Sequence, residues 1–287
     1  MSISPTRVAA RSLSVLPRRH LSRFVGRLAR KEPPQPLLEA VMALYRRAYD
    51  VDMGDYVVPP GGYPSFDAFF TRELKPGTRP LDPDERSVLS PADGRIEDFG
   101  VIDGDARLLV KGTQYEVGEL LGDPHAAAEF ENGRFAIVYL SPRDYHRVHA
   151  PVSGPVTMVR HVPGTLYPVN AIGLRHIPML FARNERVVVM QRSERFGRVA
   201  TIMVGAIGVG RISMSFDDSI ITNDGSGAGL RVYGDDPPHL ERGEELGIFH
   251  LGSTVILMLP PGADARLLGD GGHRVRMGEA LARQEGR

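Results

Sequence analysis

A serine lies inside an apolar stretch near the C-terminus of the chain. The stretch runs from His250 to Leu259 and contains the step Gly252-Ser253-Thr254 near its start. We expect one short strand over 250–259 with both faces buried, because apolar residues occupy both alternating sets of positions. A buried hydroxyl is costly unless it is hydrogen-bonded or reacts, and a glycine leaves its own carbonyl unshielded. Ser253 is therefore a candidate nucleophile, and the Gly252 carbonyl is its candidate electrophile.

The densest polar cluster of the chain lies over residues 141–149, where His146 and His149 are three positions apart. This spacing occurs in some metal sites, but two histidines alone make a poor zinc set and the HExxH pattern is absent. We therefore predict no metal. For each histidine considered alone, a structural role is the competing interpretation.

Two short segments of the chain resemble each other. Residues 90–96 and 150–156 share the pattern Pro-x-x-Gly-x-(Ile/Val), which predicts a tight turn that leads into a strand. Two such units indicate a duplicated β core. If the two turns face each other, the carboxylate of Asp93 meets the histidine cluster, an arrangement of base and orienting group that activates a serine. An ordinary α/β-hydrolase is disfavoured, because Leu251 and Val255 occupy the glycine positions of a GxSxG elbow.

The composition predicts many short strands and turns. The chain has 287 residues with 32 Gly, 23 Pro and 42% hydrophobic residues, and both Gly and Pro interrupt regular structure. We expect an α+β fold that is mainly β, with a duplicated sandwich-like or barrel-like core. The absence of cysteine excludes thiolate nucleophiles and disulfides. The formal charge of zero gives no indication of nucleic-acid binding.

The N-terminal region is basic and is predicted to be helical. Residues 1–31 contain eight Lys or Arg and no acidic residue, and apolar residues recur at helical spacing over 18–31. This is the pattern of an amphipathic helix lying on an anionic membrane, with a solvated basic helix or a cleavable presequence as alternatives. A second amphipathic helix follows Pro36, and Ser65 is placed to cap a short helix. We expect a helical head over 1–75 and a catalytic β-rich domain over 76–287, with no membrane span.

The remaining body is predicted to contain short elements. We expect short helices around 117–121 and 125–130, a strand over 135–140, and a hairpin formed by 186–191 and 199–207. The polar, glycine-rich stretch 223–229 is predicted to be a mobile loop or a lid.

Taken together, these motifs resemble those of one family. The chain is similar to the phosphatidylserine decarboxylases, pyruvoyl-dependent enzymes of phospholipid synthesis, over most of its body. The matching segments are Pro91-Ala92-Asp93-Gly94, Tyr139 to His149, Val162-Pro163-Gly164, Leu180 to Arg186, and Phe249 to Thr254. One departure is Arg211, which follows Gly208-Val209-Gly210 where a small residue is expected.

The resemblance implies that the chain cuts itself. In such enzymes Ser253 Oγ attacks the Gly252 carbonyl to form an ester, elimination gives dehydroalanine, and hydrolysis leaves a pyruvoyl group. The products would be a β chain, 1–252, and an α chain, 253–287, which form a heterodimer; further dimerisation is left open. The pyruvoyl ketone would form a Schiff base with phosphatidylserine, release carbon dioxide and yield phosphatidylethanolamine, without PLP or metal.

The resemblance also suggests roles for the polar residues. His149, oriented by Asp93, is our choice for the base that activates Ser253, and Asp144 is expected to support the same histidine. His146 is the candidate acid that protonates the decarboxylated product; alternatively it only binds the substrate carboxylate or phosphate. The basic head fits a peripheral protein on the cytoplasmic side of the cell membrane.

Two other classes of protein stay open. A zinc peptidase or a phosphotransfer module would also suit a β body with histidines, and metal analysis would separate them. A non-catalytic membrane adaptor would explain the basic head but not the Leu-Gly-Ser-Thr step. A single intact band on a denaturing gel would favour the adaptor.

Overall fold

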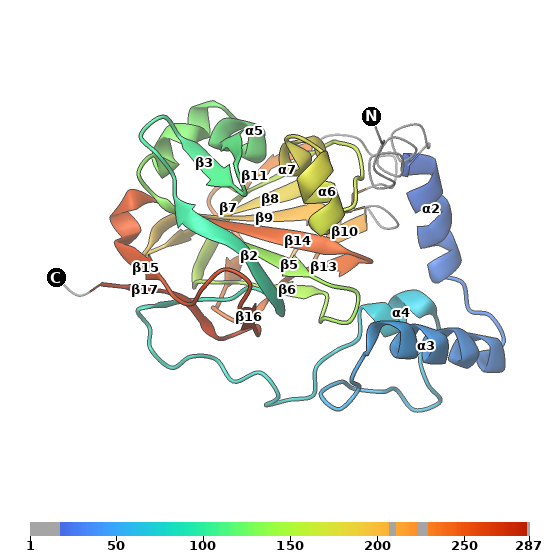
Figure 1. The fold of residues 1–287 in the computed structure, drawn as a ribbon. Helices are drawn as coiled ribbons and strands as arrows, with labels where there is room; N and C mark the ends of the chain where they lie inside the picture. The colour runs from blue at the N-terminus through green and yellow to red at the C-terminus, as the bar shows by residue number, and fades with distance from the viewer. Residues whose placement is uncertain (1–17, 207–210, 223–228, 286–287) are drawn as a thin grey trace, which may run out of the picture.

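The chain is organised around one nine-stranded antiparallel sheet (Figure 1). The computed structural model describes residues 18–206, 211–222 and 229–285. The sheet has the order β11-β7-β8-β9-β14-β5-β2-β16, and β12 pairs with β7. Its strands are β2 (Gly94–Val101), β5 (Arg134–Leu140), β7 (Gly154–Val162), β8 (Arg186–Ser193), β9 (Gly197–Gly205), β11 (Gly229–Val232), β12 (His239–Leu240), β14 (Ser253–Leu259) and β16 (Arg274–Val275).

Three smaller sheets complete the β structure. One has the order β1-β17-β15, one has the order β10-β13-β6, and the third is the hairpin β3-β4. Their bounds are β1 (Ser87–Leu89), β3 (Arg107–Val110), β4 (Thr113–Glu116), β6 (Arg147–His149), β10 (Arg211–Met214), β13 (Glu245–His250), β15 (Ala265–Leu267) and β17 (Ala280–Gln284).

Two apolar cores lie on opposite faces of the large sheet. One contains Val255 and Leu257 of β14 and also side chains of β6, β10 and β13. The other contains Ile256 and Met258 with side chains of α5 (Val117–Leu121) and α7 (Leu180–Arg183). The prediction that both faces of this strand are buried is confirmed, because every residue of β14 is buried.

The predicted strand over 250–259 is wrong at its start. His250 ends β13, and Ser253 begins β14 in a different sheet. Between them Leu251 has φ +79° and Gly252 has φ +58°, so the backbone turns through the left-handed region. An alternating apolar pattern is unbroken across this point, so it could not reveal the turn.

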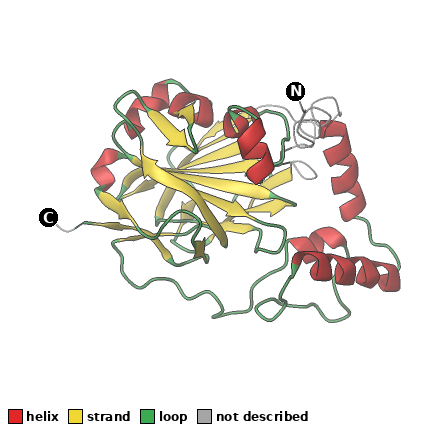
Figure 2. Cartoon of the chain, viewed as in Figure 1, coloured by secondary structure: helices red, strands yellow, loops and turns green. Residues whose placement is uncertain are grey.

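The predicted fold class is confirmed in its coarse form: the chain is mostly β and belongs to the α+β class (Figure 2). The barrel-like alternative is wrong for the described part of the chain, where the large sheet is open and ends at β11 and β16. The two Pro-x-x-Gly turns do lead into strands, β2 and β7, as predicted. The expected loop 223–229, except Gly229, and the small-residue stretch before Arg211 lie outside the described residues.

The predicted N-terminal helices are present. They are α2 (Arg18–Ala29), α3 (Gln35–Tyr49) and α4 (Phe66–Phe70), and Figure 1 shows them beside the sheets. Ser65 caps α4 by accepting a hydrogen bond from the Ala68 N–H at 3.1 Å. In the described ranges, no helix is both long and apolar enough to cross a membrane. The boundary between head and body at 75 stays a prediction.

The other helices are short. The predicted segments 117–121 and 125–130 are helical, the first as α5 and the second as a 3₁₀ helix (His125–Phe130). A hairpin joins β8 and β9 as predicted, with Gly197 paired to Ser193. The sequence reading did not include α6 (Ala171–His176), α7 or the 3₁₀ turn Pro261–Ala263.

Candidate active site

Ser253 is held at the first position of β14, between two other strands. It is opposite Leu140 of β5 and Gly205 of β9. The residue is completely buried, and its Oγ has no hydrogen-bond partner within the described parts of the chain. A buried hydroxyl without a partner is costly, which makes this atom a candidate for a reacting group.

The peptide segment before Ser253 is conformationally strained. A non-glycine residue in the left-handed region costs about 1–2 kcal/mol, and Leu251 lies in that region with φ +79°. The strained residue therefore lies one position before Gly252, next to the Gly252–Ser253 bond at which the chain is predicted to be cut.

His146 is a buried, neutral imidazole with one free nitrogen. Its Nδ1–H donates to the Asp144 carbonyl at 2.8 Å, and its ring packs on Phe70 with centroids 4.1 Å apart. Burial, and next the positive charge of Arg72, lower the pKa of His146 to about 3. The Nε2 atom is buried without a partner among the described residues. His146 therefore offers an unprotonated nitrogen at neutral pH.

His149 is also fixed on both sides. Its Nδ1–H donates to the Gly243 carbonyl at 2.8 Å, and its Nε2 accepts from the Tyr145 hydroxyl at 3.0 Å. Burial lowers the pKa of His149 and raises the pKa of Tyr145. The imidazole is therefore neutral, and the phenol keeps the proton that it donates.

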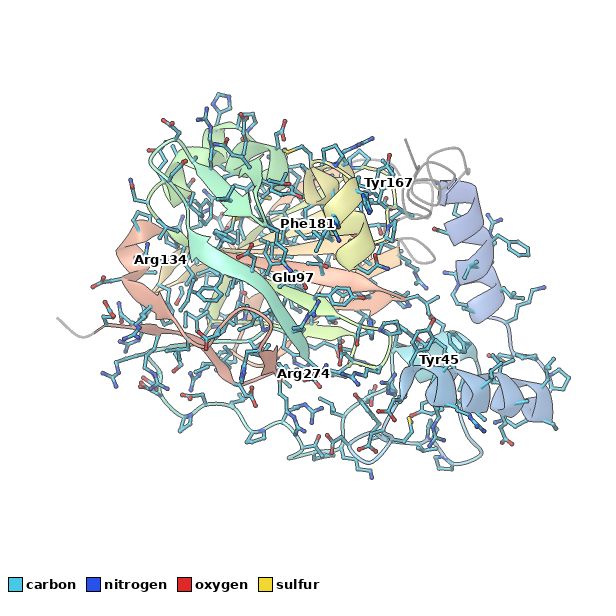
Figure 3. The ribbon with its side chains drawn as sticks, viewed as in Figure 1. Tyr45, Glu97, Arg134, Tyr167, Phe181 and Arg274 are labelled. Atoms are coloured by element: carbon cyan, nitrogen blue, oxygen red, sulfur yellow. The ribbon has the colours of Figure 1, made fainter. Side chains whose placement is uncertain are left out.

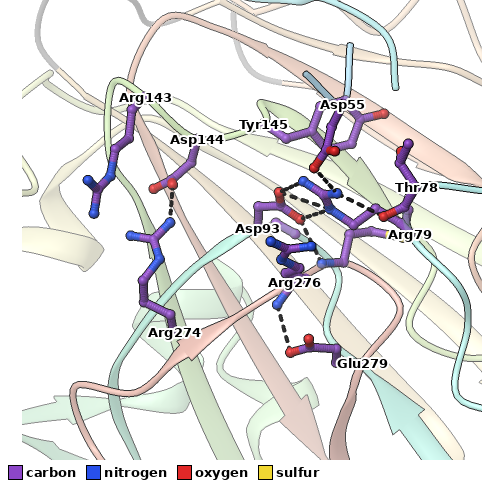
Figure 4. A network of polar contacts seen from close by, with 12 residues as sticks. Asp55, Thr78, Arg79, Asp93, Arg143, Asp144, Tyr145, Arg274, Arg276 and Glu279 are labelled. Atoms are coloured by element: carbon purple, nitrogen blue, oxygen red, sulfur yellow. Dashed lines mark hydrogen bonds and ion pairs between the residues drawn. The ribbon is translucent and has the colours of Figure 1, made fainter. Parts of the chain in front are cut away.

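Asp93 is bound by an arginine that the sequence reading missed (Figure 4). Arg79 Nε donates to both carboxylate oxygens at 3.0 and 3.1 Å, and Nη2 donates to Oδ2 at 2.6 Å. Burial works against the charge of Arg79, but the hydrogen bonds to Asp93 and Asp55 outweigh it, so the Arg79 pKa lies above its ordinary value. The Met277 N–H also donates to Asp93, at 2.8 Å.

The two Pro-x-x-Gly turns meet through their backbones. The His149 N–H donates to the Pro91 carbonyl at 2.7 Å, and the Leu89 N–H donates to the Pro151 carbonyl at 3.0 Å. The side chains of Asp93 and His149 share no hydrogen bond in the described residues, although the carboxylate acts electrostatically on the imidazole. Any orienting effect of Asp93 on His149 is thus one of charge.

Asp144 contacts His146 through its backbone carbonyl, while its carboxylate is bound elsewhere. The carboxylate accepts from Ser141 N–H at 2.8 Å and Ser141 Oγ–H at 2.6 Å, and it also pairs with Arg274. Within the described residues its carboxylate makes no hydrogen bond to His149, so the expected support of this histidine would have to be indirect. A polar cavity of about 370 Å³ is lined by both Asp93 and Asp144 but not by Ser253.

The two histidines lie at different ends of β13. The Phe249 N–H donates to the His146 carbonyl at 2.9 Å, whereas His149 is opposite Glu245. Strands rise by about 3.3 Å per residue, so His146 lies beside the end of β13 that leads to Gly252. Within the described residues, Ser253 Oγ and His146 Nε2 are both buried without a hydrogen-bond partner. Of the two histidines, His146 lies nearer the turn at 251–252.

The N-terminal helices support this region from one side. Arg72, only 1% exposed, donates to the carbonyls of Arg143 at 2.8 Å and Asp144 at 3.2 Å. Tyr45 of α3, labelled in Figure 3, donates its hydroxyl hydrogen to the Pro142 carbonyl at 3.0 Å. The sequence gives little indication of this role, because Arg72 is a single basic residue two positions after a short aromatic helix.

Fold and site together define a class of protein: a mostly β, α+β protein in which a buried serine follows a strained peptide at a strand start. The model of the phosphatidylserine decarboxylase family matches residues 66–283 of this chain. The chain therefore belongs to the phosphatidylserine decarboxylase family, as the motifs predicted.

Similar proteins extend the match toward the N-terminus. A phosphatidylserine decarboxylase proenzyme of Myxococcus xanthus is 43% identical over 249 residues, which is 87% of this chain and 88% of the relative. The proenzyme of Anaeromyxobacter sp. (strain K) is 42% identical over 274 residues, 94% of this chain and 96% of the relative. That of Xanthomonas campestris pv. campestris (strain B100) is 43% identical over 279 residues, with the same coverage of 94% and 96%. The prediction of an enzyme of this family is confirmed.

Proposed function

We propose that this protein is a self-processing phosphatidylserine decarboxylase that forms phosphatidylethanolamine and carbon dioxide. The observation that supports this best is the buried Oγ of Ser253, which has no hydrogen-bond partner among the described residues and directly follows the strained Leu251-Gly252 step. Family membership supplies the reaction, and this geometry supplies the place where the chain would generate its reactive group.

In the proposed cleavage, Ser253 Oγ attacks the Gly252 carbonyl carbon and the peptide nitrogen leaves as an amine. The Gly252 carboxylate then departs from the serine side chain by elimination, and water replaces the nitrogen with release of ammonia. Release of the strain at Leu251 would favour the first step by about 1–2 kcal/mol.

The surroundings of Ser253 fit a pyruvoyl group. The residue is dry, and two neighbouring strands fix its position. Such a ketone would supply an electron sink for loss of the substrate carboxylate. The chain itself would provide a rigid strand that orients the group and apolar surroundings that exclude water.

We assign His149 as the base for chain cleavage. It is neutral because burial lowers its pKa, and a base must be unprotonated. Its Nδ1–H is fixed by the Gly243 carbonyl, and its Nε2 lone pair, which here accepts from the Tyr145 hydroxyl, would have to exchange that partner for the Ser253 hydroxyl in the cleavage step. Asp93, held by Arg79, would stabilise the positive charge that develops on the imidazole.

We assign His146 to proton transfer during decarboxylation. Its Nε2, which has no partner among the described residues, would take a proton from the ammonium group of the substrate as the Schiff base forms and return it to the carbon that has lost carbon dioxide. Binding of the substrate carboxylate or phosphate by the same nitrogen is the competing role.

Two variants separate the histidine roles. His149→Gln should stop or strongly slow chain cleavage, whereas His146→Gln should cleave normally and form little phosphatidylethanolamine. Denaturing gels report cleavage, and product analysis reports turnover. The reverse pattern would exchange the two assignments.

The proposed location is the cytoplasmic face of the cell membrane, with α2 and α3 on the lipid surface. Large apolar side chains on these helices are exposed: Phe24 (62%), Leu28 (56%), Leu37 (57%) and Leu44 (70%). The same helices carry arginine residues that suit anionic lipid.

We also propose that the body arose from two copies of one β unit. Each Pro-x-x-Gly turn leads into a strand that is separated from the central pair β9–β14 by one strand, on opposite sides. At both turns a side chain is excluded: a Cβ at Gly94 would lie 2.5 Å from the Tyr139 carbonyl oxygen, and one at Gly154 would lie 2.1 Å from the Arg192 carbonyl oxygen.

The test is turnover of phosphatidylserine in mixed vesicles by the purified protein. The expected result is formation of phosphatidylethanolamine and carbon dioxide, with none formed by Ser253→Ala. A cleaved protein that leaves phosphatidylserine unchanged would refute the substrate assignment.

A further inference from the structure

His250 joins three parts of the molecule just before the predicted cleavage point. Its Nδ1 lies 3.0 Å from both carboxylate oxygens of Asp67, and its Nε2 lies 3.1 Å from the hydroxyl of Ser213. Asp67 belongs to α4 and Ser213 to β10. The side chains of His250 and Asp67 are only 13% and 14% exposed, so solvent screens the pair weakly.

The donors and acceptors of this group are complementary. A carboxylate only accepts, so Nδ1–H donates to Asp67; the Ser213 hydroxyl can then donate to the lone pair of Nε2. The imidazole is thereby fixed at both nitrogens, and its plane is set by groups from two different elements.

His250 directly precedes the turn that leads to the predicted cleavage point, so its contacts with Asp67 and Ser213 can affect the conformation of this turn. His250 is the last residue of β13 and pairs with Arg211 of β10. The next two residues have positive φ, and Ser253 then enters the large sheet between β5 and β9. The downstream side of the Gly252–Ser253 bond is thus fixed by β5 and β9, while the upstream side is fixed by the pairing of β13 with β10 and by the side-chain contacts of His250.

Building on the proposed self-cleavage, we propose that His250 is a positioning residue for it. Asp67 of α4 and Ser213 hold the imidazole, and this contact keeps the Leu251-Gly252 turn in the conformation that presents the Gly252 carbonyl to Ser253. Docking of α4 is therefore required for efficient cleavage, and the helix takes part in forming the site without contacting the reacting atoms.

The same helix has a second contact with the site, because Phe70 packs on the ring of His146. This contact stays intact when only Asp67 is changed. Asp67→Ala removes the acceptor of the Nδ1–H, whereas Asp67→Asn would keep an accepting oxygen, so Asp67→Ala tests the bridge without removing the helix.

The experiment follows chain cleavage after synthesis in a cell-free translation system, by denaturing gel. Asp67→Ala and His250→Ala should slow cleavage by roughly 10- to 100-fold, the size expected when reacting atoms are misplaced by about 1 Å. His250→Asn should restore much of the rate, because its amide N–H occupies the position of Nδ1 and can donate to Asp67. His239→Ala is the matched control, since His239 pairs with Glu241 on an exposed part of the body (57% and 70% exposed).

Turnover distinguishes positioning from a general loss of structure. Once fully cleaved, Asp67→Ala should have the wild-type kcat per pyruvoyl-bearing chain. Wild-type cleavage rates in both Asp67→Ala and His250→Ala would overturn the inference, as would equal slowing by His250→Asn and His250→Ala. Absence of cleavage in the wild-type protein would instead refute the proposed self-processing.

Discussion

His146 and Ser253 illustrate how burial prepares individual residues for chemistry. The imidazole is kept neutral because its surroundings disfavour the charged form, and its Nε2 has no partner within the described residues. The serine hydroxyl is also buried and makes no hydrogen bond within the described part of the chain. Both groups lose hydration without receiving full compensation, a cost that proteins bear at reactive positions.

The neutral state of His146 makes stability depend on pH. The unfolded chain binds a proton at this residue below pH 6.5, whereas the folded chain does so only below about pH 3. Stability should therefore fall as the pH falls through this window, by at most about 1.4 kcal/mol per pH unit for this residue. Urea denaturation at several pH values should show a smaller acid-side loss for His146→Gln. An identical pH dependence in both proteins would contradict the assigned cause.

The pair of Arg79 and Asp93 should contribute far more to stability than an exposed pair. Their side chains are 6% and 8% exposed, and removing one partner of such a pair costs about 3–5 kcal/mol. Arg86 and Asp84 are the control, with side-chain exposures of 54% and 25%, and solvent screening should make the loss from removing one of them much smaller. Equal losses in Arg79→Ala and Arg86→Ala, measured by urea denaturation, would refute the distinction.

At the scale of elements, the turn at 251–252 separates two sheets, and helices α3 and α4 lie against one side of the site. Periodicity predicted helices α2, α3 and α4 and the burial of both faces of β14. It could not predict the turn, because Leu251 fits the apolar alternation and nothing in its type signals a positive φ. It also could not predict that Asp67 meets His250, since that contact depends on how distant elements pack.

The exposed apolar side chains of α3 should determine membrane binding. Changing Leu37, Val41 and Leu44 together to Ser should weaken binding to anionic vesicles by more than about tenfold, because each buried apolar side chain contributes about 1.5–3 kcal/mol. Leu109→Ser is the control, since Leu109 is 62% exposed on β3. Vesicle sedimentation measures the effect, and equal weakening by the control would exclude a specific role of α3.

At the scale of the whole molecule, β14 is an inner strand of the large sheet. It has seven residue pairs with β5 and six with β9, and it begins the segment that would become the α chain in the proposed cleavage. Composition predicted the mainly β class and the motifs predicted the family. The sheet order that places Ser253 centrally required long-range pairing, which local patterns do not specify.

Because of this central position, the two products of cleavage should stay together. The α and β chains are expected to elute as one species in gel filtration and to unfold in a single transition, since removal of β14 would break the sheet in two. Separation of the chains without denaturant would show that β14 does not hold the sheet together.

The central claim is that this chain converts Ser253 into a pyruvoyl group by cutting its own backbone. Mass spectrometry of the denatured, active protein tests it most directly. We predict a long chain that ends at Gly252 and a short chain of residues 253–287 that is lighter by one ammonia than the same peptide with an N-terminal serine. Active protein that has the mass of the uncut chain, or a short chain that keeps its serine, would contradict the claim.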